Sequence, residues 1–263
     1  MARFRILLLL LALFCAAADL ARARDEAAPS TSGRVDDRAA IEAYRRGDLD
    51  SARTLWQSLL EQPARVPAAE RARILYDLGN VASREKHVLE SVGWYTAALR
   101  LSPRDADTWW NLEHARSDAK LEPADRGDLT ATLERLVSSL TLAESEWLVL
   151  GALAAWAVAL ALEALRGGRI WRRVSLALGL VVLASLAPWF FNLSRASRRP
   201  LLAIQEGKLE IRSEPRADAP AIAEVAAGDE VEALDDLPEW RKVELASGLQ
   251  GWTRKSSVFA LDR

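Results

Sequence analysis

Three uncharged apolar runs divide the sequence. The first, residues 6–14 (ILLLLLALF), follows Arg3 and Arg5. The second, residues 147–162 (WLVLGALAAWAVALAL), and the third, residues 174–193 (VSLALGLVVLASLAPWFFNL), contain no charged side chain. A helix needs about 20 predominantly apolar residues to cross a bilayer. The pattern therefore predicts transmembrane helices over residues 147–165 and 174–193. A buried helical hairpin of a soluble protein is the alternative.

The first run has the order of a secretory signal peptide, because basic residues precede it and small residues follow it (CAAADLARA, 15–23). We predict a signal peptide over residues 1–23, with A-x-A cleavage sites at 16–18 and 21–23. An uncleaved anchor helix is the alternative. Cys15 is the only cysteine of the chain, so a cleaved protein could form no disulfide in an oxidising compartment.

A short basic segment, residues 166–173 (RGGRIWRR), joins the two predicted spans. Its four arginines are Arg166, Arg169, Arg172 and Arg173. Short loops rich in arginine are retained on the cytoplasmic side of the membrane. We therefore predict a cytoplasmic loop, with the segments before residue 147 and after residue 193 outside the cytoplasm. Glu163 lies within reach of Arg166 and is interpreted as a solvated carboxylate.

Between residues 36 and 122, apolar and small side chains recur at helical spacing, with breaks such as Gly47-Asp48. This pattern predicts paired antiparallel helices. The second pair resembles the tetratricopeptide repeat. Its signature positions hold Leu75, Leu78, Gly79, Ser91, Tyr95, Ala98 and Pro103. The first pair matches in part, and residues 105–121 resemble a capping helix.

In tetratricopeptide arrays, the first helices of the pairs line a concave groove that binds peptide segments or partner proteins. The resemblance implies a groove lined by Arg73, Tyr76, Asn80 and Ser83, with Trp110 and His114 beside them. The alternative is that these side chains are solvated or pack within the module.

Residues 128–140 (DLTATLERLVSSL) place leucines on one face of a helix. We predict a juxtamembrane amphipathic helix over residues 128–146, which lies on the membrane surface or else closes the repeat domain. Thr141 and Glu144 have the spacing of a capping box at the start of the first span.

Residues 201–263 follow a period of two instead. KLEIR, DEVEAL and RKVEL alternate apolar and charged residues between turn-rich breaks, which predicts a small β-barrel. LEIRSEP, AAGDEVEAL, EWRKVEL and QGWTRKSSVF resemble the bacterial SH3-like domain, with Thr253 at a usually apolar position. Such domains bind peptides or cell-wall material. The resemblance implies a ligand surface at Arg212, Trp240 and Trp252, and the alternative is that both tryptophans fill the barrel core.

Composition narrows the class of function. The chain has 35 basic and 37 acidic residues, a formal charge of −2, so nothing indicates nucleic-acid binding. With two histidines and one cysteine, the sequence contains no metal-ligand spacing, phosphate loop or nucleophile elbow. We therefore expect no catalysis, no cofactor and no bound metal.

The predicted fold class is a multi-domain protein: an all-α tetratricopeptide-repeat module, two transmembrane helices and a C-terminal small all-β SH3-like barrel. This order resembles the BatE-like family of aerotolerance-operon membrane proteins. The resemblance implies a bacterial inner-membrane scaffold with both soluble domains in the periplasm. It also implies partners among von Willebrand factor A-type membrane proteins and a MoxR-type ATPase, in envelope stress tolerance. The alternative function is a cell-wall sensor whose SH3-like domain contacts peptidoglycan.

Overall fold

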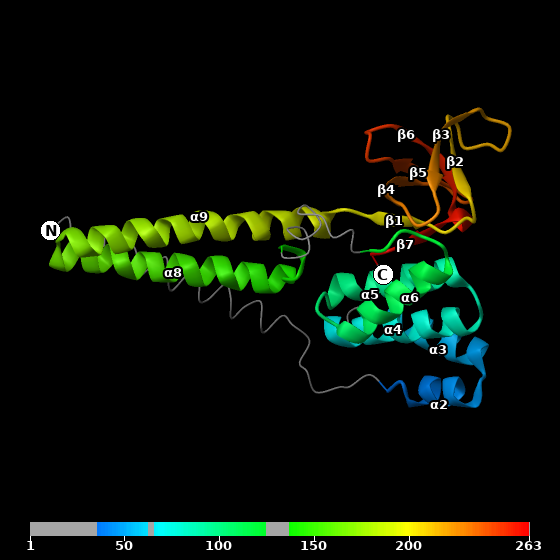
Figure 1. The fold of residues 1–263 in the computed structure, drawn as a ribbon, viewed down its shortest axis with the longest axis horizontal. Coiled ribbons are helices and arrows are strands. Elements are labelled where there is room, and N and C mark those ends of the chain that lie inside the picture. Colours follow the sequence, from blue (N-terminus) through cyan, green and yellow to red (C-terminus); the bar gives the residue numbers. More distant parts are fainter. Residues whose placement is uncertain (1–35, 63–65, 125–136, 263) are drawn as a thin grey trace. The chain divides into compact units, whose positions relative to one another are not determined.

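A computed structural model describes residues 36–62, 66–124 and 137–262 (Figure 1). The predicted signal peptide and residues 128–136 of the predicted amphipathic helix lie outside these residues. Two compact units are distinguished. Of the described residues, one unit contains those of 36–124 together with 197–262, and residues 137–196 belong to the other.

The N-terminal part of the first unit is helical, as the periodicity predicts. Its helices are α2 (Arg38–Arg46), α3 (Leu49–Leu60), α4 (Ala68–Arg84), α5 (Val88–Leu101) and α6 (Ala106–Asp118). Helices that follow one another in the sequence pack against each other (Figure 1). Local chemistry sets their ends, since Gly47 ends α2 with a left-handed φ of 82° and the Asp48 side chain caps α3 through the Ser51 amide.

The core of this helical module is aliphatic and aromatic. Trp56, Ile74, Leu75, Leu78 and Trp94 have at most 1% of their surface exposed. A glycine is required where α4 meets α5, because a Cβ atom on Gly79 would lie 2.5 Å from Cε1 of Tyr95. Both residues occupy signature positions of the resemblance noted above, so close helix packing explains their spacing.

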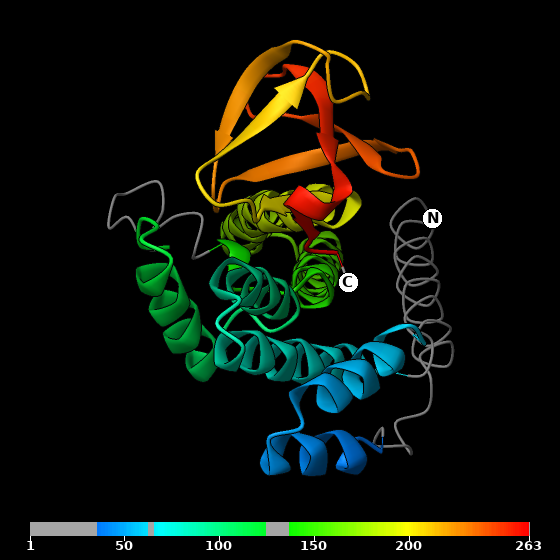
Figure 2. The same cartoon turned by 90° about the vertical axis from the view of Figure 1, so that its right-hand side faces the viewer.

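The C-terminal part of the same unit is an antiparallel sheet, in agreement with the predicted barrel. Its strands are β1 (Pro200–Ala203), β2 (Lys208–Arg212), β3 (Ala221–Ala226), β4 (Glu230–Asp236), β5 (Trp240–Glu244), β6 (Gln250–Arg254) and β7 (Val258–Ala260). They follow the order β3-β2-β6-β5-β4-β1-β7, and the sheet curls around its own core (Figure 2). That core contains Leu209, Ile211, Val231 and Val243.

Strands β1 and β7 also contact the helices of the same unit. Leu202 of β1 and Phe259 of β7 pair across the ladder and belong to the helical core. The Phe259 ring meets the Trp94 ring edge-on at 4.7 Å, with an interplanar angle of 77°. A Cβ atom on Gly93 would lie 2.6 Å from Cδ1 of Phe259. The barrel and helix α5 are therefore packed together.

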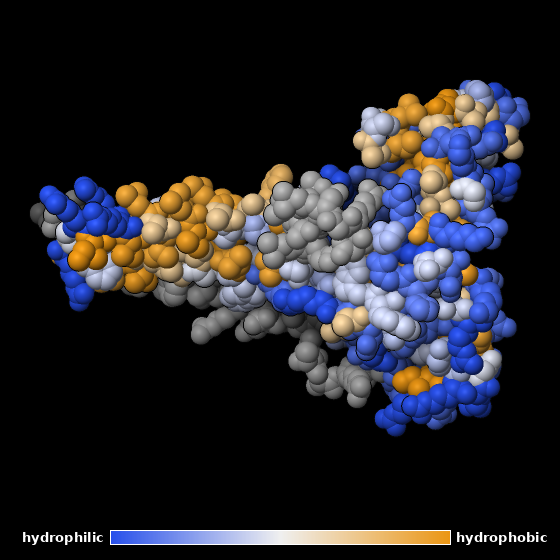
Figure 3. Space-filling view, viewed as in Figure 1, coloured by the Kyte–Doolittle hydropathy of each residue, from blue (hydrophilic) through white to orange (hydrophobic). Residues whose placement is uncertain are grey.

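The second unit is a helical hairpin of α8 (Leu142–Arg166) and α9 (Arg169–Ser197). Both helices are long and apolar enough to cross a membrane, and only 11% and 17% of their most apolar windows are buried. A core hairpin of a soluble protein would be mostly buried, so this alternative fits poorly. Figure 3 shows apolar side chains along the pair and hydrophilic ones at its turn.

Two predicted boundaries change in this unit. The turn is shorter than the predicted loop 166–173, because α9 already begins at Arg169 and Gly167 and Gly168 take positive φ values of 68° and 98°. Residues 142–146 belong to α8 rather than to a separate amphipathic helix. The predicted capping box at Thr141 is confirmed, since its hydroxyl accepts from the Glu144 amide and the Glu144 carboxylate accepts from the Thr141 amide.

The two helices contact each other through small and polar side chains. The indole of Trp156 packs over Gly179, where a Cβ atom would lie 3.3 Å from Nε1 of that indole. Glu163 accepts a hydrogen bond from the Ser175 hydroxyl of α9. The carboxylate predicted to be solvated near Arg166 is therefore bonded to the facing helix.

Candidate ligand-binding surfaces

Tyr76 and Asn80 of α4 form a polar ladder with α5 and α6. The Asn111 amide donates to Tyr76 Oη and to Asn80 Oδ1, each at 3.1 Å. The Tyr95 hydroxyl donates to the same Asn80 oxygen at 2.8 Å. Two predicted groove residues thus lie together, but their polar atoms are engaged within the module.

Arg73 is surrounded by carboxylates. Its guanidinium lies 2.7 Å from Asp37, 2.6 Å from Glu70 and 3.4 Å from Asp77. Burial alone would lower the pKa of Arg73, but the hydrogen bonds and charges of Glu70 and Asp37 outweigh it and raise that pKa. Burial raises the pKa of Asp77 to about 6, against the opposing charge of Arg73. Arg73 is accordingly a structural ion-pair centre.

Trp110 and His114 are the exposed aromatic residues of α6. Trp110 has 64% of its surface exposed. Its ring stacks on His114 at 4.7 Å with an interplanar angle of 21°. Ser83, on α4, is also exposed. These predicted groove residues are more exposed than Tyr76 and Asn80, which are half-buried.

A cavity of about 280 Å³ lies at the start of α4 and α6. Arg73 and Tyr76 line it, whereas Asn80, Ser83, Trp110 and His114 do not. Asp105 and Asp107 line its other side and were not identified from the sequence. The sequence feature that could have pointed to Asp105 is its N-cap position on α6, where its side chain accepts a hydrogen bond from the Thr108 amide at 2.7 Å.

The barrel has a second cavity, of about 210 Å³. It brings together Arg212 and Trp240 as the sequence predicts, while Trp252 lies outside it. Arg254, absent from the prediction, places its guanidinium carbon 5.6 Å from the Trp240 ring centroid. Both tryptophans are half-buried and neither belongs to the barrel core, so the interpretation as core residues does not fit.

Thr253 lines the same cavity and carries an unsatisfied group. Its surface is 1% exposed, and its hydroxyl oxygen has no hydrogen-bond partner among the described residues. Leaving a buried hydroxyl unbonded costs about 1–3 kcal/mol. Arg212 is held in place by the Ala219 carbonyl at 2.6 Å and by Glu210. The cavity therefore combines an aromatic wall with two arginines, of which Arg212 is held in place by hydrogen bonds.

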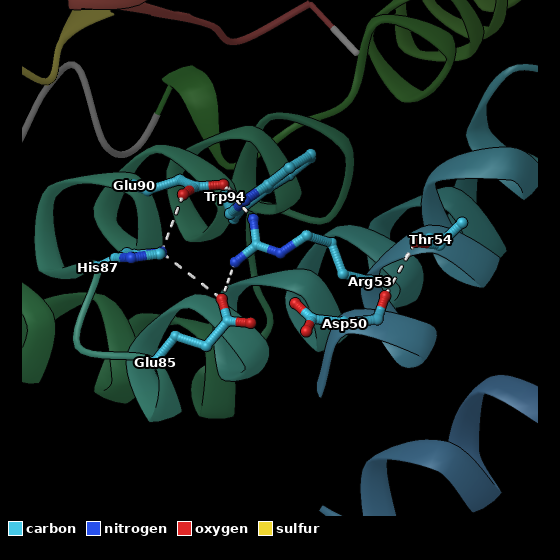
Figure 4. Close-up of polar contacts among 7 residues, drawn as sticks. All are labelled: Asp50, Arg53, Thr54, Glu85, His87, Glu90 and Trp94. Atoms are coloured by element: carbon cyan, nitrogen blue, oxygen red, sulfur yellow. Dashed lines mark hydrogen bonds and ion pairs between the residues drawn. The ribbon is translucent and has the colours of Figure 1, made fainter. Parts of the chain in front are cut away.

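A further charged cluster joins the two helix pairs (Figure 4). Arg53 of α3 pairs with Glu85 and lies 2.6 Å from Glu90 of α5. The Trp94 indole donates to the same Glu90 oxygen at 3.0 Å, and His87 Nδ1 lies 3.6 Å from that carboxylate. Because Arg53 of α3 bonds to carboxylates before and within α5, this cluster ties the first helix pair to the second.

Within residues 36–62, 66–124 and 137–262, no group of three or more His, Cys, Asp or Glu side chains is placed to hold a metal ion.

Comparison with known proteins identifies the barrel. Residues 207–258 match the family model of the bacterial SH3 domain. The match includes strands β2 to β6, with Arg212, Trp240 and Trp252, and it begins after β1. No curated protein and no solved structure matches the chain. The C-terminal barrel is therefore a bacterial SH3 domain, a class that often binds peptidoglycan or proteins.

Proposed function

We propose that the chain is a membrane-anchored interaction protein of the BatE-like kind. Helices α8 and α9 cross the bacterial inner membrane, and the arginines of residues 166–173 hold their turn in the cytoplasm. The helical module and the SH3 domain then lie in the periplasm. The length and apolar surface of the two helices support the membrane anchor, and the bacterial SH3 match supports a bacterial protein.

The helical module binds a partner protein. The observation that carries this proposal is the exposed indole of Trp110, stacked on His114. Exposed tryptophans give a large rigid contact at low entropic cost and dominate many interfaces. Tyr76 and Asn80, which accept hydrogen bonds from Asn111 of α6, position α4 against α6. We propose von Willebrand factor A-type membrane proteins as partners, in an envelope stress or aerotolerance complex, and binding without catalysis or cofactor.

Capture from native membranes tests this proposal. The full chain is crosslinked in its membrane, and the captured proteins are identified and quantified. The double variant Trp110→Ala/His114→Ala is expected to reduce capture by roughly tenfold or more. Leu55→Ala, which also truncates an exposed apolar side chain on another helix, is the matched control and should capture normally. Undiminished capture by the double variant would disprove the role of α6.

A second candidate function is favoured by the SH3 cavity, which Arg212, Trp240 and Arg254 line together. On this alternative the domain binds peptidoglycan or a peptide. Sedimentation with intact peptidoglycan tests it. Trp240→Ala should then lose binding while Leu249→Ala, an exposed apolar truncation on the β5–β6 hairpin, retains it. Capture that survives changes on α6 but is lost in Trp240→Ala would make the SH3 domain the recognition module.

A further inference from the structure

Four arginines gather at the turn of the α8–α9 hairpin. Arg166 ends α8, and Arg169, Arg172 and Arg173 belong to the first turns of α9. The two-residue turn between the helices, Gly167 and Gly168 with positive φ, brings them to one end. All four side chains are exposed. We call residues 166–173 the arginine turn.

The positive charge of the arginine turn is not neutralised locally. Among the described residues, none of its four arginines forms an ion pair with a carboxylate; the guanidinium of Arg166 lies 5.9 Å from the Trp171 ring centroid. Glu163, one helical turn away, accepts from Ser175. An uncompensated cluster of this density attracts anions strongly.

The arginines just beyond the other end of α9 behave differently. Arg198 lies 3.9 Å from Glu232, and Arg199 lies 3.3 Å from Asp236 and 3.8 Å from Asp262. The same chain thus pairs these arginines with its own carboxylates and leaves those of the arginine turn unpaired. The difference indicates that the turn meets its counter-charge outside the chain.

Apolar side chains stand among these arginines. Ile170 has 74% of its surface exposed, and Trp171 is half-buried. Alternation of cationic and apolar groups suits the boundary between lipid headgroups and acyl chains, where guanidinium groups meet phosphates and an indole meets hydrocarbon. A free phosphate ion could use only the arginines, whereas a phospholipid uses both kinds of side chain.

We propose that the arginine turn binds the phosphate groups of anionic phospholipids. This inference rests on the proposed membrane insertion of α8 and α9. Guanidinium groups bind phosphate oxygens in pairs of parallel hydrogen bonds, so four arginines favour a headgroup with two phosphates, such as cardiolipin, over one with a single phosphate. Basic clusters next to a membrane span bind anionic lipids by this chemistry.

The test uses the full chain reconstituted in nanodiscs of phosphatidylcholine with a minority of cardiolipin, followed by native mass spectrometry of the retained lipid. The wild-type chain is expected to retain cardiolipin in preference to phosphatidylcholine. The variant R166Q/R169Q/R172Q/R173Q should retain it roughly tenfold less. The matched control R198Q/R199Q, which removes two arginines already paired with carboxylates, should retain cardiolipin as the wild type does.

Several results would overturn the inference. They are equal retention by the wild type and the quadruple variant, equal loss in the control variant, displacement of the lipid by inorganic phosphate, or a requirement of the arginines for an acidic protein but not for lipid. If the quadruple variant cannot be purified, R172Q/R173Q should still reduce retention severalfold, and unchanged retention counts against the proposal.

Failure of this inference can be told apart from failure of the proposed function. Insertion is measured first, as resistance of the full chain to carbonate extraction from vesicles of phosphatidylcholine alone. A chain that does not insert contradicts the membrane anchor itself. A chain that inserts but shows no preference for cardiolipin contradicts only lipid binding by the arginine turn.

Discussion

Substitution of Asn80 by alanine is expected to destabilise the contact of α4 with α5 and α6. The change removes one oxygen that accepts from two donors, Tyr95 Oη at 2.8 Å and Asn111 Nδ2 at 3.1 Å. Tyr95 is 2% exposed, so its hydroxyl cannot turn to water. Burial also raises the pKa of Tyr95, which keeps that hydroxyl protonated and in need of an acceptor.

The two lost bonds are unequal. A buried donor left without an acceptor costs about 1–3 kcal/mol, and this cost falls on Tyr95. The Asn111 amide is half-buried and keeps its hydrogen bond to Tyr76, so the loss of its bond to Asn80 adds less to the free-energy cost. We therefore expect Asn80→Ala to cost on the order of 2–3 kcal/mol. Tyr95→Phe should relieve most of that cost, because the ring remains against Gly79 while the unbonded hydroxyl is gone.

Hydrogen exchange of the full chain in detergent measures this effect. Peptides from α5 and α6 should lose protection by roughly tenfold for each 1.4 kcal/mol in Asn80→Ala. Ser83→Ala, an exposed change on the same helix, should leave protection unchanged. Asn80→Ala and Tyr95→Phe should couple by about 2 kcal/mol in a double-mutant cycle. Strictly additive effects, or normal protection in Asn80→Ala, would refute the shared hydrogen bond.

Three further outcomes follow from the same reasoning. In the folded chain the pKa of Asp77 is raised to about 6, above the ordinary 3.8. The free energy of unfolding should therefore fall as pH rises between these two values. In urea denaturation, Asp77→Asn should stabilise the chain by on the order of 2–3 kcal/mol at pH about 8 and change its stability little at pH about 4. Gly93→Ala gains about 1 kcal/mol of helix propensity but meets Phe259 at 2.6 Å. It should therefore increase hydrogen exchange in β7, whereas Gly151→Ala, with nothing within 4 Å, should not. Reversal of the arginines of residues 166–173 to glutamate should scramble the orientation of a cytoplasm-only reporter fused after the last residue, and an unchanged orientation would disprove the charge argument.

Local patterns predicted the elements of the fold well. Each element depends on contacts between residues close in sequence, so its pattern can be recognised from the sequence alone. Gly79 permits the close approach of Tyr95, sixteen positions later in the same helical hairpin. Thr141 caps α8 together with Glu144, three positions later. Alternation in KLEIR places Leu209 and Ile211 in the barrel core. The bounds of the turn at residues 166–173 were less accurate, because arginines are good helix formers and α9 begins inside the segment.

The candidate sites were predicted less completely, because their polar side chains form hydrogen bonds and ion pairs with residues that are distant in sequence. Its position on the predicted groove face does not show that Arg73 forms an ion pair with Asp37. Nor does it show that the Asn80 side-chain oxygen accepts hydrogen bonds from Tyr95 and Asn111. In the barrel, Arg254 joins Trp240 only through the pairing of β5 with β6. Thr253, which departs from the resemblance by its hydroxyl, is nonetheless buried, with 1% of its surface exposed.

The contact between the helical module and the barrel is marked in the sequence by a continuous apolar segment, which differs from the alternating pattern of the other strands. Residues 201–204 (LLAI) are continuously apolar, and β1 is buried at every position. Leu201 faces the barrel core while Leu202 faces the helical core, and in β7 Val258 and Phe259 divide in the same way. A strand with a core on each side needs apolar residues on both faces. Excision of residues 201–263 would therefore remove part of the helical core as well, so point substitutions such as Trp240→Ala, and not deletion of the barrel, can separate the roles of the two modules.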